Sequence, residues 1–309
     1  MQEINHPYAT PSPLKEIHFD WAKERNLKFF IKRDDLIHEA VSGNKWRKLK
    51  YNILQAKHLG KTGILTFGGA YSNHILATAH ACMTHGMKSI AFIRGDELNP
   101  NSNSILEKCV EWGMDLRFIS REEYRIKDDY DYLNELKSEF WSYFIVPEGG
   151  KNFFGIIGCQ EIIKEIDLDF DDIWCAIGTA TTAIGLSMTI KADQKVHAVP
   201  VLSGFNSEDE IETSLKRQGF GPETKDDVLS NLTFHNDYSF GGYGKTTNEL
   251  VNFIKMISSQ HNLFLDPVYT GKAFYAMVDY YEKNDSTTDR TIVFLHTGGL
   301  IAGTGLLEK

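Results

Sequence analysis

Several features that mark other protein classes are missing from this chain of 309 residues. No apolar run reaches membrane-spanning length, and the first residues have neither the basic start nor the apolar core of a signal peptide. The 4 cysteines form no Cys-x-x-Cys pair, and the 11 histidines form no His-Glu-x-x-His motif. We therefore expect a soluble cytoplasmic protein with reduced, mostly buried thiols and with no metal site.

Positive charge is also in short supply. Lysine and arginine number 33 against 42 aspartates and glutamates, which gives a net charge of −9. This balance argues against broad binding to nucleic acids or anionic membranes, although a local basic patch such as Lys45–Lys50 remains possible. With 42% hydrophobic residues, the chain can bury a substantial core as one large domain or two moderate ones.

Two nucleotide-binding motifs are absent as well. No Gly-x-Gly-x-x-Gly follows an apolar run, as a dinucleotide fold requires. The segment Gly244-Lys245-Thr246-Thr247 is similar to the end of a P-loop, but Ser239 stands where that motif needs its first glycine. Neither motif supports a nucleotide-binding protein.

Apolar runs of strand length are present, and helix-like segments separate most of them. Such alternation predicts right-handed β-α-β crossovers, and hence an α/β fold whose parallel sheets bind ligands at the carboxyl ends of strands. The predicted strands are Phe29–Ile31, Ile64–Phe67, Ser89–Ile93, Leu116–Ile119, Tyr143–Val146, Ile173–Ile177, Val196–Leu202, Leu232–His235 and Thr291–Leu295.

One lysine stands directly behind a flexible turn. Ser42-Gly43-Asn44 places Lys45 at the head of a helix-like run. A lysine amine whose pKa is lowered by burial or nearby positive charge can form a Schiff base with an aldehyde cofactor. The alternative is a solvated lysine in the first turn of a basic helix.

Two further glycine turns each follow a predicted strand and open a helix. The first runs from Gly68 to His74, and the second is Gly178-Thr179-Ala180-Thr181-Thr182. In the second, small residues expose backbone N–H groups, and three threonine hydroxyls can donate hydrogen bonds, which suits a phosphate. An ordinary glycine and threonine turn is the alternative.

These motifs occur in the order seen in one enzyme family. The chain resembles the 1-aminocyclopropane-1-carboxylate deaminase and D-cysteine desulfhydrase family of fold-type II pyridoxal-phosphate enzymes. The segments that carry the resemblance are Lys32–Leu36, Ser42–Lys45, Ser72–His74, the loop from Gly178, Gly242–Gly244, Asp266–Lys272 and His296–Gly299.

The resemblance implies a two-lobed fold of the tryptophan synthase β type, with parallel sheets and pyridoxal 5'-phosphate in the cleft between the lobes. Residues 1–48 and 150–309 would form the large cofactor-binding domain, and residues 49–149 the small domain. It also suggests a homodimer.

The same resemblance assigns roles to residues. Lys45 would bind the cofactor aldehyde and later act as the base at the substrate α-carbon. Asn73 would bond the ring hydroxyl, and Ser72 would lie by the substrate carboxylate, although both residue types also cap helices. The residues expected to hold the phosphate are Gly178, Thr179, Ala180, Thr181 and Thr182.

Further residues are expected on or near the substrate side. Tyr243 and Tyr269 resemble family tyrosines that move protons or bond the substrate, while isolated tyrosines more often pack in cores. His74 would either support the site or cap the helix locally. Tyr71 stands where the family usually has glutamine, and Leu76 where it often has arginine, so both bear on substrate choice.

Two threonines decide between substrates. Members that open a cyclopropane ring carry glutamate at the position of Thr270, beside the pyridine nitrogen, and leucine at Thr297. Desulfhydrase-like members carry threonine at both, as this chain does. The prediction is therefore α,β-elimination from D-cysteine or a related β-substituted D-amino acid, giving pyruvate, ammonia and sulfide. The alternatives are 1-aminocyclopropane-1-carboxylate deamination to 2-oxobutanoate and ammonia, and a protein that binds the cofactor without catalysis.

Overall fold

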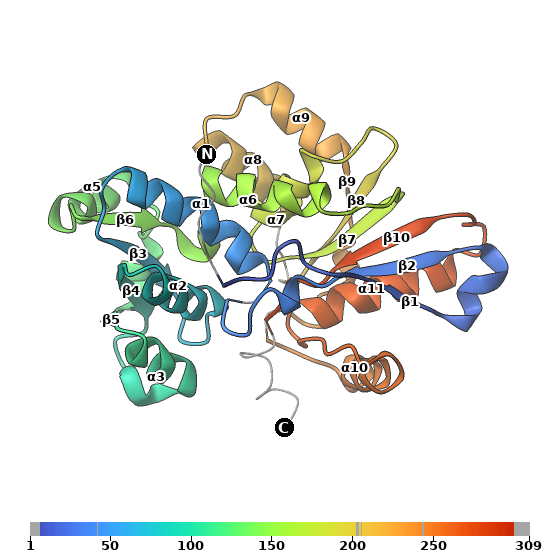
Figure 1. Cartoon of the computed structure of the whole chain (residues 1–309), viewed down its shortest axis with the longest axis horizontal. Coiled ribbons are helices and arrows are strands. Elements are labelled where there is room, and N and C mark those ends of the chain that lie inside the picture. The colour runs from blue at the N-terminus through green and yellow to red at the C-terminus, as the bar shows by residue number, and fades with distance from the viewer. Residues whose placement is uncertain (1–6, 42, 202–203, 205, 243, 300–309) are drawn as a thin grey trace. The chain divides into compact units, whose positions relative to one another are not determined.

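The computed structural model describes residues 7–41, 43–201, 204, 206–242 and 244–299 (Figure 1). Contacts between residues divide the chain into two compact units. The first consists of Lys45–Gly158, His38–Val41 and the segment that ends at Tyr8. The second consists of Ala9–Ile37, residues 43–44 and the described residues from Cys159 onward.

A four-stranded parallel sheet lies at the centre of the first unit. Its strand order is β5-β4-β3-β6. β3 is buried along its whole length, which explains why its sequence is an unbroken apolar run rather than an alternating one. The strands are β3 (Gly63–Gly68), β4 (Lys88–Arg94), β5 (Met114–Ile119) and β6 (Tyr143–Val146).

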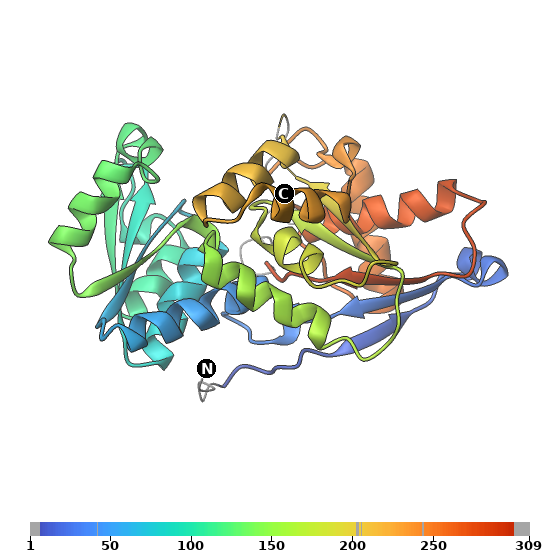
Figure 2. The same cartoon turned by 90° about the horizontal axis from the view of Figure 1, so that it is seen from above.

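Helices cover both faces of this sheet (Figures 1 and 2). Ala56 of α1 belongs to the same core cluster as Ile64 of β3, whereas Leu136 of α5 clusters with Leu65. Neighbouring strand residues thus feed opposite cores, as the two-residue period of a strand requires. The helices are α1 (Asn44–His58), α2 (Asn73–Thr84), α3 (Ser104–Glu111), α4 (Arg121–Arg125) and α5 (Tyr130–Glu139).

A six-stranded sheet lies at the centre of the second unit. Its order is β1-β2-β10-β7-β8-β9, and every pair is parallel except β1 with β2. The strands are β1 (Leu14–Ile17), β2 (Lys28–Lys32), β7 (Asp172–Ile177), β8 (Lys195–Pro200), β9 (Leu232–Phe234) and β10 (Thr291–Leu295).

All nine predicted strands are present, and the α/β fold class is confirmed. β1 was not predicted, because its four residues include two charged ones and are too few to show a clear alternation. β8 ends at Pro200, a residue that has no N–H to offer a ladder, and the predicted strand end at Leu202 lies outside the described residues.

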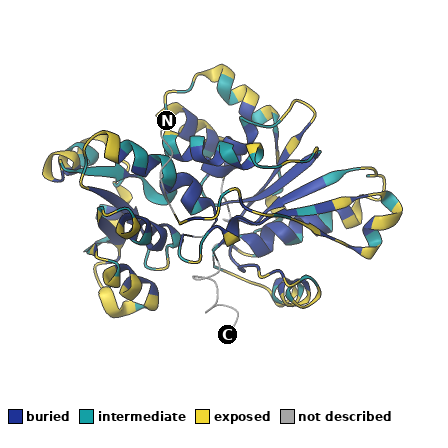
Figure 3. Ribbon diagram, viewed as in Figure 1, coloured by how far each residue is buried: buried dark blue, intermediate teal, exposed yellow. Residues whose placement is uncertain are grey.

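The second sheet is also covered on both faces. Figure 1 shows α10 and α11 on one face and α7, α8 and α9 on the other. The ring of Phe274 on α11 meets that of Phe294 on β10 edge-on, with centroids 4.9 Å apart. Figure 3 shows the central strands of this sheet buried and the outer helices exposed at their rims. The helices are α6 (Phe153–Lys164), α7 (Thr181–Ser187), α8 (Ser207–Arg217), α9 (Pro222–Ser230), α10 (Asn248–His261) and α11 (Thr270–Lys283).

Asp172 collects several polar side chains at the amino end of β7. Arg290 donates to both of its carboxylate oxygens, at 2.6 and 2.8 Å, and Tyr281 donates at 2.6 Å. His197 Nε2 lies 3.0 Å from the carboxylate, and its Nδ1 lies 2.9 Å from His235 Nε2. Burial opposes ionisation of Asp172, yet the bonds from His197 and Arg290 lower its pKa to about 2.

This cluster predicts a loss of stability in acid. Burial, with the nearby charge of His197, lowers the pKa of His235 from 6.5 to about 4. Between pH 6.5 and about 4, His235 is protonated in the unfolded chain but stays neutral in the folded one. The stability that the neutral His235 contributes is therefore fully present above pH 6.5 and is lost as the pH falls towards 4. Allowing for partial exposure, we expect a loss of on the order of 2 kcal/mol. Denaturant unfolding at several pH values should show a flatter profile for His235→Gln. The neighbouring, non-titrating change Asn236→Gln should keep the wild-type slope, and an equal slope in His235→Gln would contradict the assignment.

The four cysteines all lie in the cores. Each is fully buried, and none forms a disulfide. Burial raises the pKa of Cys82 and of Cys109 to about 12. Within the described ranges, no helix has the length and apolar character needed to cross a bilayer.

Candidate active site

The turn before Lys45 is fixed by the ends of two strands. Gly43 has a φ of +66°, and a Cβ at this position would lie 1.7 Å from the carbonyl oxygen of Thr297, so only glycine fits. Asn44 N–H donates to the same carbonyl at 3.3 Å, and Gly43 N–H donates to Asp34 at 2.9 Å. Asp34 follows β2 and Thr297 follows β10, which are neighbours in the sheet.

The same turn is bonded to the loop after β7. Asn44 Nδ2 donates to Thr182 Oγ1 at 3.0 Å, and both residues are buried. Lys45 is the next residue along the chain, at the start of α1, and is half-buried. The backbone that leads into Lys45 is therefore held against the predicted phosphate loop.

The loop after β7 contains a polar atom without a partner. The Thr181 side chain is fully buried, and its Oγ1 bonds to no described residue. The residue before α7, Ala180, supplies no side-chain cap. At the start of the loop, a Cβ on Gly178 would lie 2.6 Å from the ring of Tyr269. The loop thus keeps the Thr181 hydroxyl as a donor for an external anion and packs closely against Tyr269.

Tyr269 and Thr270 belong to a turn that Asp266 organises. One Asp266 oxygen accepts from Val268 N–H at 2.9 Å and from Tyr269 N–H at 2.7 Å. The other accepts from Thr270 N–H at 2.9 Å and from the Thr270 hydroxyl at 2.7 Å. Asp266 N–H in turn donates to Thr270 Oγ1 at 2.9 Å. Because these bonds fix both backbone and side chain, the first turn of α11 is rigidly defined.

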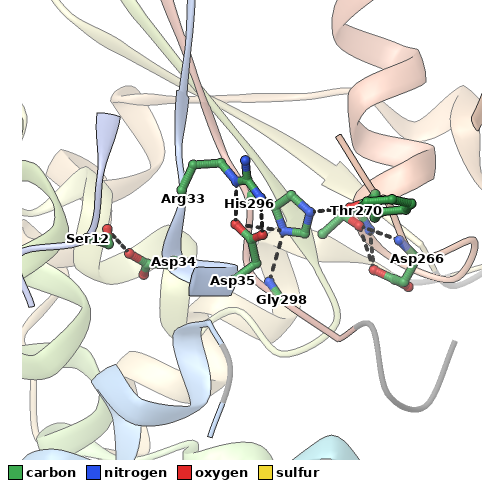
Figure 4. A network of polar contacts seen from close by, with 9 residues as sticks. Ser12, Arg33, Asp34, Asp35, Asp266, Thr270, His296 and Gly298 are labelled. Atoms are coloured by element: carbon green, nitrogen blue, oxygen red, sulfur yellow. Dashed lines mark hydrogen bonds and ion pairs between the residues drawn. The ribbon is translucent and has the colours of Figure 1, made fainter. Parts of the chain in front are cut away.

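A second network fixes the backbone around residue 297 (Figure 4). Arg33 donates to both oxygens of Asp35, at 2.8 and 2.6 Å, and Asp35 N–H donates to His296 O at 3.1 Å. His296 Nε2 faces the Phe264 carbonyl at 2.6 Å, whereas its Nδ1 accepts from Gly298 N–H at 3.2 Å. The His296 ring thus links the Phe264 carbonyl on one side to the Gly298 N–H on the other, and its Nδ1 also lies 3.7 Å from Asp35 Oδ1.

Lys272 holds the loop that precedes residue 243. Its side chain is fully buried, and its Nζ donates to the carbonyls of Ser239 and Gly242, at 2.7 Å each. Burial lowers the pKa of Lys272 to about 8, against the opposing charge of Asp266. The predicted site residue Tyr243 itself lies outside the described residues.

The remaining predicted residues lie around the start of α2 in the first unit. Ser72 caps α2 by accepting from Ile75 N–H at 3.4 Å, and Asn73 is the first helical residue. Tyr71 is 64% exposed, whereas Leu76 is buried in the core of the unit. The capping bond does not remove the second lone pair or the hydrogen of the Ser72 hydroxyl, which stay available to a ligand.

His74 is buried and neutral. Thr66 Oγ1 donates its single hydrogen to Val146 O at 2.7 Å, so it must accept from His74 Nε2 at 2.9 Å. The other ring nitrogen, Nδ1, is buried without a described partner. Burial, followed by the positive charges of Lys45 and Lys48, lowers the pKa of His74 to about 3. His74 therefore offers a lone pair and no positive charge at neutral pH.

The structure brings together some predicted residues within each unit. Thr182 adjoins the lysine turn, Gly178 packs on Tyr269, and Thr297 supports Gly43, all in the second unit. The first unit contains Lys45 and the segment from Tyr71 to His74. Sequence reasoning missed Asn44, Asp266 and Lys272. Asn44 precedes Lys45 directly, and Asp266 and Lys272 are the two ends of the segment Asp266–Lys272 that carries the family resemblance. Their positions in these segments were the signal that could have identified them.

Comparisons with known proteins agree on one family. The model of the family described as "Pyridoxal-phosphate dependent enzyme" matches residues 7–298. A Thermotoga maritima protein named as a candidate 1-aminocyclopropane-1-carboxylate deaminase is 33% identical over 291 residues, covering 90% of this chain and 91% of its own.

Two further relatives extend the comparison. The Arabidopsis thaliana mitochondrial protein named as a bifunctional D-cysteine desulfhydrase and 1-aminocyclopropane-1-carboxylate deaminase is 32% identical, covering 91% of this chain and 74% of its own. The crystal structure of an ACC deaminase homologue superposes with a TM-score of 0.79 at 27% identity, covering 98% of this chain and 95% of that one. The match to the family model and these relatives span nearly all of the chain, and we conclude that it belongs to the pyridoxal-phosphate dependent enzyme family, with the fold-type II architecture of its lyases.

Proposed function

We propose that this enzyme is a lyase for β-substituted D-amino acids, with D-cysteine as the leading substrate. One D-cysteine and one water would give pyruvate, ammonia and hydrogen sulfide. The observation that carries the proposal is the 3.0 Å bond from Asn44 to Thr182, because it joins the lysine turn to the loop suited to phosphate. An incidental surface lysine would need no such attachment.

The described residues fit pyridoxal phosphate. The buried Thr181 hydroxyl, which bonds to no described residue, supplies a donor for a phosphate. When bound, the cofactor supplies an aldehyde that couples to amines and a ring that accepts electrons from the substrate α-carbon. Gly178, Thr179, Ala180, Thr181 and Thr182 would hold its phosphate.

Each remaining residue has a proposed task. Lys45 would hold the cofactor through its amine and, once released, take the proton from the substrate α-carbon at Nζ. Asn73 would donate to the ring hydroxyl, and Ser72 would donate to the substrate carboxylate. Tyr269, which packs on Gly178, and Tyr243 would bond the substrate or move protons, with Tyr71 and His74 at the edge of its site.

Thr270 and Thr297 support elimination over ring opening. A carboxylate beside the pyridine nitrogen strengthens the ring as an electron sink, and ring-opening members carry glutamate there. Hydrosulfide leaves readily from the β-carbon, so its loss makes smaller demands on the ring. The name of the Arabidopsis thaliana relative includes both activities, which keeps 1-aminocyclopropane-1-carboxylate as the second candidate substrate.

A product assay tests the proposal. The purified enzyme with pyridoxal phosphate is given D-cysteine, L-cysteine or 1-aminocyclopropane-1-carboxylate, and keto acid and sulfide are measured. We expect pyruvate and sulfide in equal amounts from D-cysteine. Release of 2-oxobutanoate from 1-aminocyclopropane-1-carboxylate alone would transfer the assignment to the second candidate. An absorption band that no amino acid perturbs would indicate cofactor binding without catalysis.

Thr181→Val should separate cofactor binding from stability. Loss of the hydroxyl is expected to weaken pyridoxal-phosphate affinity about tenfold, which corresponds to about 1.4 kcal/mol. It should also stabilise the cofactor-free protein by about 1 kcal/mol, because a buried hydroxyl without a partner is removed. Cofactor titration and thermal melting measure the two effects. The matched change Thr182→Val strands the Asn44 amide and should instead lower the stability of the cofactor-free protein. Lower stability with unchanged affinity in Thr181→Val would contradict the phosphate role.

We further propose a cytoplasmic homodimer that acts on small amino acids without nucleic-acid or membrane partners. The family resemblance supports the dimer, and the net charge of −9 supports the absence of polyanionic partners. Analytical ultracentrifugation of the cofactor-loaded enzyme would test the dimer directly.

A further inference from the structure

The Thr270 hydroxyl has a fixed polarity. Its single hydrogen is donated to Asp266 Oδ2 at 2.7 Å, and one of its lone pairs accepts from Asp266 N–H at 2.9 Å (Figure 4). A hydroxyl has one hydrogen and two lone pairs, so one acceptor position is left and no donor. A group that approaches the Thr270 oxygen therefore finds a hydrogen-bond acceptor and no donor.

The Asp266 carboxylate binds the hydrogen of the Thr270 hydroxyl strongly. Its side chain is buried and accepts from three backbone N–H groups, at Val268, Tyr269 and Thr270, besides the hydroxyl. A hydrogen bond to an ionised carboxylate is stronger than one between neutral groups, and burial strengthens it further. Turning the hydroxyl towards another acceptor would exchange the stronger bond for a weaker one.

We propose that Asp266 acts through Thr270 to keep the pyridine nitrogen of the bound cofactor protonated. This rests on the proposed function, in which Thr270 lies beside that nitrogen. A neutral pyridine nitrogen offers only a lone pair, and two facing lone pairs repel. A protonated nitrogen offers the N–H that the remaining lone pair of Thr270 can accept.

Protonation of the pyridine nitrogen affects which reactions the cofactor ring can support. A protonated ring is the stronger electron sink, which is the property that glutamate confers at this position in ring-opening members. Asp266 is a positioning residue that would supply part of this bias through one intervening hydroxyl. The neutral Thr270 oxygen accepts more weakly than a carboxylate does, so the ring stays a weaker electron sink than in ring-opening members, and elimination stays the favoured reaction.

The test is a direct measurement of the ring nitrogen. The enzyme is reconstituted with pyridoxal phosphate that carries nitrogen-15 in the ring, and its chemical shift is followed against pH by NMR. In the wild type we expect the protonated form at neutral pH. Asp266→Asn places an NH₂ group opposite Thr270, which would donate to the hydroxyl and turn its hydrogen towards the ring. We expect the pKa of the ring nitrogen to fall by about one unit or more, a tenfold change in the ratio of protonated to neutral forms.

Companion variants control for a purely structural effect. Thr270→Ser keeps the hydroxyl and should keep the wild-type shift, whereas Thr270→Val should give the neutral form. In the Thr270→Val background, Asp266→Asn should change the shift no further, because the proposed route runs through the hydroxyl. Far-UV circular dichroism verifies that each variant is folded.

The outcomes separate the two proposals. A neutral nitrogen in the wild type overturns the inference even if Asp266→Asn fails to fold. An additional effect of Asp266→Asn without the hydroxyl also overturns it. Failure of the wild type to form a visible band with pyridoxal phosphate would overturn the proposed function as well.

Discussion

Lys45→Ala is expected to abolish the visible absorption band of the cofactor-loaded enzyme and to lower keto acid release by roughly four orders of magnitude. The reason is that one amine would both hold the cofactor and take the α-proton, so its loss removes two functions. The bond between Asn44 and Thr182 holds the residue before Lys45 against the loop that is proposed to bind the phosphate. Absorption spectra and keto acid assays measure the two effects.

Two controls sharpen this test. Lys45→Arg keeps the positive charge but forms no stable bond with an aldehyde, so it should lose the band as completely as alanine does. Lys50→Ala removes a lysine further along the same helix, whose ammonium lies 5.3 Å from the ring centroid of Tyr51. This variant should keep the band and the activity. Retention of the band in Lys45→Ala would sink the assignment of the lysine.

Gly43→Ala is expected to destabilise the protein by about 3 kcal/mol or more, from a positive φ combined with a backbone clash. The new methyl group would meet the Thr297 carbonyl oxygen at 1.7 Å, and backbone atoms cannot move aside as a flexible side chain would. Any relief must shift the turn, so cofactor affinity should fall along with the melting temperature. Thermal melting and cofactor titration measure both.

Gly60→Ala is the matched control. Gly60 has the same φ of +66°, but a Cβ there meets nothing within 4 Å. It should lose only about 1 kcal/mol from backbone strain and leave cofactor affinity unchanged. Equal losses in the two variants would show that the contact with Thr297 is unimportant.

The sheets and the glycine turns could be predicted from the sequence because their signals are local. A buried parallel strand such as β3 reads as an apolar run, and a turn residue such as Gly178 follows it directly. The capping role of Ser72 was one of two alternatives, and the structure contains that bond without excluding the other. Local patterns name what a residue is able to do.

The partners of the site residues could not be predicted in this way. Asn44 meets Thr182 across 138 positions of sequence, and Gly43 fits Thr297 only because β2 and β10 are neighbours. A strand order that pairs the second strand with the tenth leaves no trace in local periodicity. The hydrogen assignments at His74 and Thr270 likewise follow from distances alone.

The burial of the four cysteines bears on how the enzyme would tolerate the sulfide that the proposed reaction releases. Polysulfides, which form when sulfide is oxidised, persulfidate exposed thiolates, whereas buried thiols with a raised pKa are inert. Cys82, Cys109, Cys159 and Cys175 are each fully buried, and the pKa of the first two is about 12. The protein should therefore withstand polysulfides that form from sulfide, the product of the proposed reaction, without persulfidation. It can also be purified without added thiol reductants, which would otherwise compete for the cofactor aldehyde and interfere with sulfide assays.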